Sequence, residues 1–136
     1  MDELRVDIVA ETDPPTGSAT KLRLYWRRQD ALAVSLVVVR EPAHPALVAG
    51  EWVILRDFLR YGMYAATGDG NVRLRPGTDA DVVFELSGAA GKCSMTVPAD
   101  VLRDFLDATE RVVPAGRESS DEAIDRLIEE LLGREP

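Results

Sequence analysis

Two residues of this chain have side chains suited to nucleophilic, acid–base or metal chemistry and occur only once, His44 and Cys93. A catalytic histidine needs an orienting carboxylate and a nucleophile, but His44 lies between Pro42 and Pro45 in a predicted loop that marks neither. Cys93 falls on the apolar face of a predicted strand, where a thiol is normally a small inert hydrophobe. No pairing of the two has zinc-ligand spacing. We therefore expect no catalytic residue, no metal and no cofactor.

The run Gly68-Asp69-Gly70 could present backbone N–H groups to a phosphate. It lacks the GxxxxGK[ST] pattern, precedes a predicted strand rather than a helix, and carries a carboxylate that repels phosphate. A plain turn is the better interpretation.

Paired-carboxylate hydrolysis is also disfavoured. Such a site needs an acid in apolar surroundings, and only Glu85 lies within an apolar run, where its side chain alternates outward.

A third kind of chemistry is nucleic-acid binding by arginines and aromatic rings. The candidates are four arginines on a short predicted helix and a predicted strand, with three aromatic residues: Arg56, Arg60, Arg73, Arg75, Trp26, Tyr61 and Tyr64. Together they could form a stacking and charge platform. Pairing of these arginines with Asp57 and with the acidic helices is the commoner outcome. We therefore keep nucleic-acid binding as the alternative to protein binding.

Length and charge limit the class of protein. The 136 residues predict one domain, 1–136, with 46% hydrophobic and 29% charged residues, as in ordinary globular proteins. The net charge of −8 is uneven, because residues 98–136 hold five arginines and eleven acids, −6, and leave −2 for the rest. Such an acidic region favours a basic protein partner and repels nucleic acid and anionic lipid. The N-terminus has no apolar export segment, so we expect a cytoplasmic protein without direct membrane insertion.

The elements that must position these residues are mainly strands. Alternation with a period of two predicts strands over 4–10, 21–26, 72–75, 82–86 and 93–97, and a valine-rich run predicts one over 33–39. Another short strand begins at Trp52 and runs into one or two helical turns, after which Gly62 has the place of a left-handed helix cap. Residues 67–71 have turn composition.

Two helices are predicted at the end of the chain. Pro98 suits a first helical position, and an apolar stripe continues to Thr109 until Pro114 stops it. Ser119 and Glu122 form a capping box before a second stripe that ends at Leu132. The predicted fold class is α+β, with about seven antiparallel strands, one short inserted helix and two C-terminal helices.

Four stretches of this sequence carry a family resemblance. The most specific is 52–76, with Trp-Val, Arg-Asp-Phe-Leu and Thr-Gly-x-Gly-x-Val-Arg-Leu-Arg-Pro in order. The others are Leu24-x-Trp26-x-x-x-Asp30-Ala31-Leu32-Ala33-Val34, then Phe105-Leu106-x-x-Thr109 with Val113-Pro114-x-Gly116-x-Glu118, and the amphipathic stretch 121–132. In these stretches the chain resembles the SsgA-like sporulation and cell-division proteins of actinobacteria, of the SsgB type. Trp26 replaces the usual tyrosine and Ala31-Leu32 a Pro-Tyr pair, which leaves the paralogue open.

The resemblance implies a whirly-like fold and a protein without catalytic activity. It implies an adaptor in sporulation-specific cell division that acts at division septa and helps to position or recruit the septation machinery. The implied partners are division proteins, FtsZ or another SsgA-like paralogue. The alternative from another class is a single-stranded nucleic-acid-binding module with the same fold, which the negative charge disfavours. A small enzyme with an unrecognised pocket is a third possibility.

The strand predicted over 33–39 is apolar on both faces. Val37 and Val39 lie opposite Leu36 and Val38, and only one face can rest against the predicted helices. A second apolar face commonly marks an interface. Together with the resemblance, this predicts a homotrimer in which Val37 and Val39 lie at the subunit interface.

Overall fold

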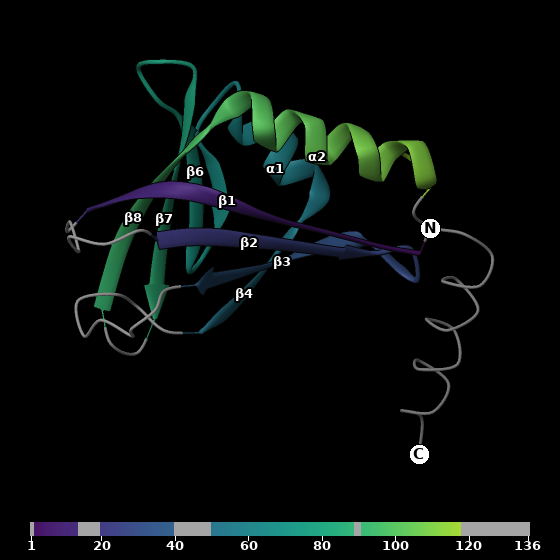
Figure 1. Ribbon diagram of the computed structural model, residues 1–136, viewed down its shortest axis with the longest axis horizontal. Coiled ribbons are helices and arrows are strands. Elements are labelled where there is room, and N and C mark those ends of the chain that lie inside the picture. The colour runs from purple at the N-terminus through teal and green to yellow at the C-terminus, as the bar shows by residue number, and fades with distance from the viewer. Residues whose placement is uncertain (1, 14–19, 40–49, 89–90, 118–136) are drawn as a thin grey trace.

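The computed structural model describes residues 2–13, 20–39, 50–88 and 91–117 (Figure 1). Eight strands and two helices lie in these ranges, where about seven strands were predicted. Their bounds are β1 Glu3–Asp13, β2 Thr20–Arg27, β3 Asp30–Val39, β4 Glu51–Leu55, α1 Arg56–Gly62, β5 Thr67–Asp69, β6 Val72–Pro76, β7 Asp81–Gly88, β8 Gly91–Pro98 and α2 Ala99–Val112. The extra strand is β5, because the stretch predicted to be only a turn also pairs with β6.

All eight strands form one antiparallel sheet in the order β4-β3-β2-β1-β8-β7-β6-β5. The long strand β1 joins its two halves: residues from Glu3 to Ala10 pair with β2, and residues from Glu11 to Asp13 pair with β8. Figure 1 shows β1 to β3 running across the view, whereas β6 and β7 run nearly upright and cross their direction. The sheet is therefore strongly curved, and α2 lies over its inner face.

The inner face holds the core because the period-two alternation of the strands puts every second residue there. In the first half, register partners on the four neighbouring strands β1, β2, β3 and β4 form one row on this face: Val6, Leu24, Leu36 and Trp52. Leu24 and Leu36 are fully buried. The predicted strands and their buried faces are thus confirmed in this half of the sheet.

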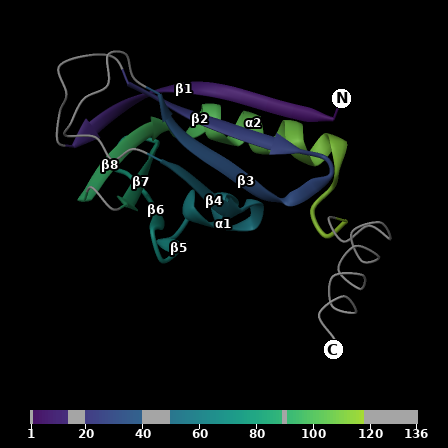
Figure 2. The same ribbon diagram turned by 90° about the horizontal axis from the view of Figure 1, so that it is seen from below.

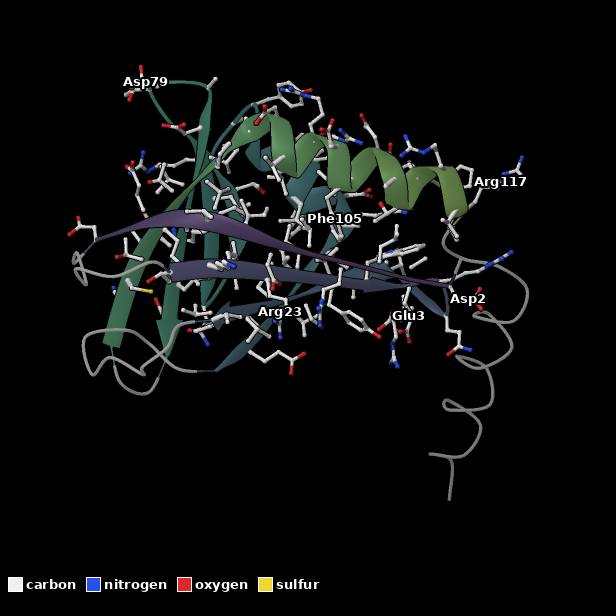
Figure 3. The ribbon with its side chains drawn as sticks, in the orientation of Figure 1. Asp2, Glu3, Arg23, Asp79, Phe105 and Arg117 are labelled. Atoms are coloured by element: carbon white, nitrogen blue, oxygen red, sulfur yellow. The ribbon has the colours of Figure 1, made fainter. Side chains whose placement is uncertain are left out.

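The second half of the sheet and α2 complete the same core. Leu74, Phe84 and Met95 are register partners across β6, β7 and β8, and all three are buried. The predicted stripe of α2 contributes buried Leu102, Phe105, Leu106 and Thr109. Figure 3 shows Phe105 between α2 and the strands, with Arg23 on the other side of the sheet.

A long-range hydrogen bond ties the two halves together. The indole Nε1 of Trp52 on β4 donates to the carbonyl of Ser87 on β7 at 2.8 Å. This bond satisfies the one polar group of a largely buried side chain. It also holds β4 near the far half of the sheet, although β4 pairs in the sheet only with β3.

The short helix α1 follows β4 without a loop and lies beside β4 and β5 (Figure 2). The prediction that Gly62 is a left-handed cap is wrong, since Gly62 is the last residue of α1 and has no positive φ. A Cβ at this position would lie 2.6 Å from the Cβ of Leu74. The glycine is needed because α1 packs closely on β6, a contact that no local pattern reveals.

Two other predictions differ from the structure or fall outside it. Pro98 is the N-cap of α2 rather than its first helical residue, with an extended backbone at φ −62° and ψ 134°. The predicted loop around His44 and the predicted helix 119–132 lie outside the described residues.

Candidate interaction surface

The residues considered for catalysis that lie in the described ranges, Cys93 and Glu85, do not form a reactive site together. Cys93 is buried as predicted, and Glu85 is exposed as predicted, with Oε1 3.5 Å from Nε of Arg75. No group of histidine, cysteine and acidic residues in the described ranges could hold a metal ion. A polar recess of about 690 Å³ is lined partly by Arg73, Glu85 and Lys92, with charges of both signs.

The proposed arginine and aromatic platform does not form. Arg56 and Trp26 are only 2% and 1% exposed, so neither can meet a nucleic acid. Inside the core, the guanidinium carbon of Arg56 lies 5.7 Å from the centroid of the Trp26 ring, and Nη1 donates to Oγ1 of Thr109 at 3.4 Å. The guanidinium thus contributes a cation–π contact and a link between α1 and α2.

Arg60, one turn after Arg56, has a different role. Its Nη2 donates to Oδ1 of Asp107 and to Oε2 of Glu110, both at 2.8 Å. Burial opposes the charge, but the two carboxylates outweigh burial and raise the pKa of Arg60. The predicted pairing of the short helix with an acidic helix is confirmed for Arg60, whereas Asp57 takes no part in these ion pairs.

The outer face of β1 to β4 mixes charged and apolar residues. One row joins Asp7, Arg23, Val37 and Glu51 across the four strands. Asp7 and Arg23 form a two-point ion pair, with Nε to Oδ1 at 2.8 Å and Nη2 to Oδ2 at 3.1 Å. The hydrogen bond from Arg23 lowers the pKa of Asp7. Val37 lies on this face as predicted, and it is half-buried.

The exposed large apolar side chains are concentrated in one part of the described chain. Six such residues are present, and four of them fall between positions 53 and 64, on β4, α1 and the turn that follows. Their exposed fractions are 62% for Val53, 45% for Leu55, 66% for Tyr61 and 69% for Tyr64. Exposed apolar side chains on neighbouring elements are candidates for a binding surface. We call this set the β4–α1 surface.

Two small hollows adjoin the β4–α1 surface. One, of about 130 Å³, is lined by Ala33, Val53, Ile54, Leu55 and Phe58, all apolar. The other, of about 170 Å³, shares Ala33 and Val53 and adds polar residues, among them Tyr25 and Glu51. Val53 therefore stands between a fully apolar hollow and a more polar one.

Sequence reasoning named Val37 and Val39 but missed Val53 and Leu55. The signal was present, since Glu51–Leu55 alternates, with Trp52 and Ile54 buried and the other three residues exposed. Two of these three, Val53 and Leu55, are apolar where a solvated strand would carry polar residues. The same pattern could have marked this strand as a binding surface.

The fold and the surface define a class of protein: an α+β domain built on one curved antiparallel sheet, with exposed large apolar side chains on β4, α1 and the turn that follows. No helix in the described ranges is long and apolar enough to span a membrane. The chain belongs to the SsgA family, described as Streptomyces sporulation and cell division protein, whose model matches residues 20–118.

Similar proteins are sporulation-specific cell division proteins. The chain is 42% identical over 84 residues to SsgB of Saccharopolyspora erythraea, which covers 57% of this chain and 60% of the relative. The match to SsgB of Streptomyces coelicolor, at 34% identity, likewise spans 62% of that protein. A longer match to SsgB of Salinispora tropica has 31% identity over 128 residues and covers 83% of this chain and 90% of the relative.

Solved structures agree with the family assignment. The crystal structure of an SsgA-like sporulation-specific cell division protein from Thermobifida fusca has a TM-score of 0.72 at 26% identity, and covers 94% of both chains. An SsgB structure, described with mutations that correlate to longitudinal cell division during sporulation of Streptomyces coelicolor, has a TM-score of 0.71 at 27% identity. It covers 85% of this chain and 92% of that one.

Proposed function

We propose that this protein is a non-enzymatic adaptor in sporulation-specific cell division. It helps to position or recruit the septation machinery, including FtsZ, by protein–protein contacts at division septa. One observation carries the proposal: in a member of the SsgA family, four of the six exposed large apolar side chains of the described residues belong to the β4–α1 surface. Such a surface suits binding of another protein.

A fluorescent fusion followed through sporulation tests the adaptor role. Foci arranged in ladders at the positions of future septa are the expected result. A signal spread evenly through the cell, or one that follows the nucleoid, contradicts the proposal. Deletion of the gene should reduce the number of sporulation septa while growth before sporulation continues.

We further propose that the protein acts as a homotrimer. Val37 and Val39 extend the apolar part of the outer sheet face, beside the exposed Val53 on β4. A neighbouring subunit covering this face would remove apolar surface from water. Light scattering coupled to size exclusion should give a mass near three times 14.9 kDa. A monomeric mass at low micromolar concentration contradicts the proposal, and Val37→Glu or Val39→Glu should dissociate the trimer.

Nucleic-acid binding remains the alternative from another class, and we expect it to be negligible at physiological salt. Binding of phosphates depends on clustered bases. Here Arg56 is buried and Arg60 is paired with two acids. Anisotropy of a labelled single-stranded oligonucleotide tests this. Micromolar affinity with a steep salt dependence would restore the alternative and place it near Arg73 and Arg75.

A further inference from the structure

The edge of the sheet at β4 is unpaired among the described residues. β4 is an outermost strand and pairs only with β3, from Val37↔Glu51 to Ala33↔Leu55. Its other edge makes no backbone hydrogen bond to any residue in the described ranges. A strand edge of this kind presents a row of N–H and C=O groups that an extended segment can pair with.

The side chains beside this edge are suited to a partner strand. Val53 and Leu55 point outward on the same face of β4, and the apolar hollow that they line with Ala33 and Phe58 has a volume of about 130 Å³. In strand addition, backbone hydrogen bonds supply affinity while pockets for alternate side chains supply specificity. The hollow can receive one aliphatic side chain of such a strand.

Charges at the two ends of the strand indicate what the partner carries. Glu51 at the start of β4 and Asp57 directly after it are both exposed, and neither forms an ion pair with a described residue. A segment lying along β4 therefore has a carboxylate near each end. Opposite charges at those positions favour encounter and fix the register.

We infer that β4 is a strand-addition site for an extended segment of a partner protein, with alternating aliphatic residues and a lysine or arginine near each end. This inference rests on the proposed adaptor function and specifies how the partner is held. The segment adds a ninth strand beside β4, places one aliphatic side chain in the hollow, and directs its basic ends to Glu51 and Asp57.

The test uses the full-length protein and a synthetic probe, the blocked hexapeptide Lys-Thr-Val-Thr-Leu-Lys. Nuclear magnetic resonance of the ¹⁵N-labelled protein during titration to millimolar peptide should show the largest amide shifts in β4 and little change in β7. Two further peptides serve as controls. N-methylation of alternate amides removes backbone donors, and glutamate in place of both lysines reverses the end charges. Each change should raise Kd by about tenfold or more.

Matched variants of the protein locate the binding. Val53→Asp should raise the Kd of the peptide by about tenfold or more, since it puts a charge beside the apolar hollow. Val9→Asp is the control, because Val9 is 65% exposed against 62% for Val53 and lies on β1 of the same sheet face. It should leave Kd within about twofold. Leu55→Asp is a second variant of the site, should Val53→Asp fail to fold by circular dichroism.

Three results overturn the inference. The first is no amide shift in β4 at millimolar peptide. The second is equal binding of the N-methylated peptide, which would mean that side chains alone hold it. The third is that copies of the free protein associate with one another through β4. Val53→Asp would then lower the mass of the assembly, and the peptide would not compete with this association. In that case the occupant is a second copy of this chain.

The inference and the proposed function fail separately. Septal foci from a protein that binds no extended peptide at β4 would overturn the strand-addition site and leave the adaptor role standing. Strand addition by a protein that is spread evenly through sporulating cells would overturn the adaptor role alone.

Discussion

Within the described ranges the sheet ends at two unpaired edges, β4 and β5, which differ in length and composition. β5 pairs with β6 over only three residues, and it contains Gly68 at φ +153°. β4 is five residues long and exposes Val53 and Leu55. Proteins commonly protect an edge by making it short or irregular. β5 follows that rule and β4 does not, which is why we assign binding to β4.

The two edges are joined by α1, and both depend on how this helix is held. Gly62 packs against Leu74 of β6, and Arg60 pairs with α2. The following predictions therefore disturb the connection between the edges and each edge itself, from the largest expected effect to the smallest.

The largest expected effect comes from Gly62→Ala. The new Cβ would lie 2.6 Å from the Cβ of Leu74, inside the core, so helix or strand must move. Overpacking of this kind costs about 1–3 kcal/mol, and we expect the upper part of that range. Urea denaturation followed by circular dichroism measures the loss. Leu74→Gly removes that Cβ, so Gly62→Ala should cost less in a Leu74→Gly chain than in the unchanged one, and an equal cost in both would contradict the proposed clash.

A smaller effect is expected for Gly68→Ala in the β5 edge. Its Cβ would lie 2.3 Å from the carbonyl oxygen of Val72, and its φ is unfavourable for any other residue. Such strain costs about 1–3 kcal/mol, but only three residue pairs hold β5, so local separation should limit the loss to about 1 kcal/mol. Hydrogen exchange should quicken in β5 while β7 stays protected. Loss of protection throughout the sheet would contradict this.

Arg60→Ala should lower the free energy of unfolding by about 0.5–1 kcal/mol. It removes two half-exposed ion pairs to α2, which contribute little in solvent. Arg103→Ala is the control, because Arg103 is exposed on α2 and makes no ion pair with a described residue. Chemical denaturation of both variants in low and high salt measures the difference. If Arg103→Ala costs as much as Arg60→Ala, the ion pairs do not stabilise the α1–α2 contact.

The smallest effect on stability is expected for Val53→Lys, within about 0.5 kcal/mol, because the side chain is exposed. Lysine on an edge strand resists pairing with other chains, so this change makes β4 resemble a protected edge. Thermal unfolding should therefore be unchanged while binding of the hexapeptide is lost. Retained binding would show that β4 is not the site.

Local patterns predicted much of this molecule. Alternation along 4–10 and 82–86 placed strands and their buried faces correctly, because a strand buries every second residue wherever it pairs. The apolar stripe after Pro98 predicted α2 and its buried face, because a helix that packs on one side buries residues spaced three or four positions apart. The order of motifs between Trp52 and Pro76 predicted the family. The short strand β5 was missed, since turn residues and a three-residue edge look alike in sequence.

What the sequence determined alone is therefore most of the described elements, their inner faces and the family, since each depends on residues close together in the chain. Tertiary structure decided the roles of Arg56 and Arg60, which are one turn apart on α1. Arg56 is buried against Thr109, 53 positions away, while Arg60 reaches Asp107. It also decided why Gly62 must be glycine and which edge exposes apolar residues. These outcomes depend on which distant segments the curved sheet brings together, and a local pattern contains no information about those contacts.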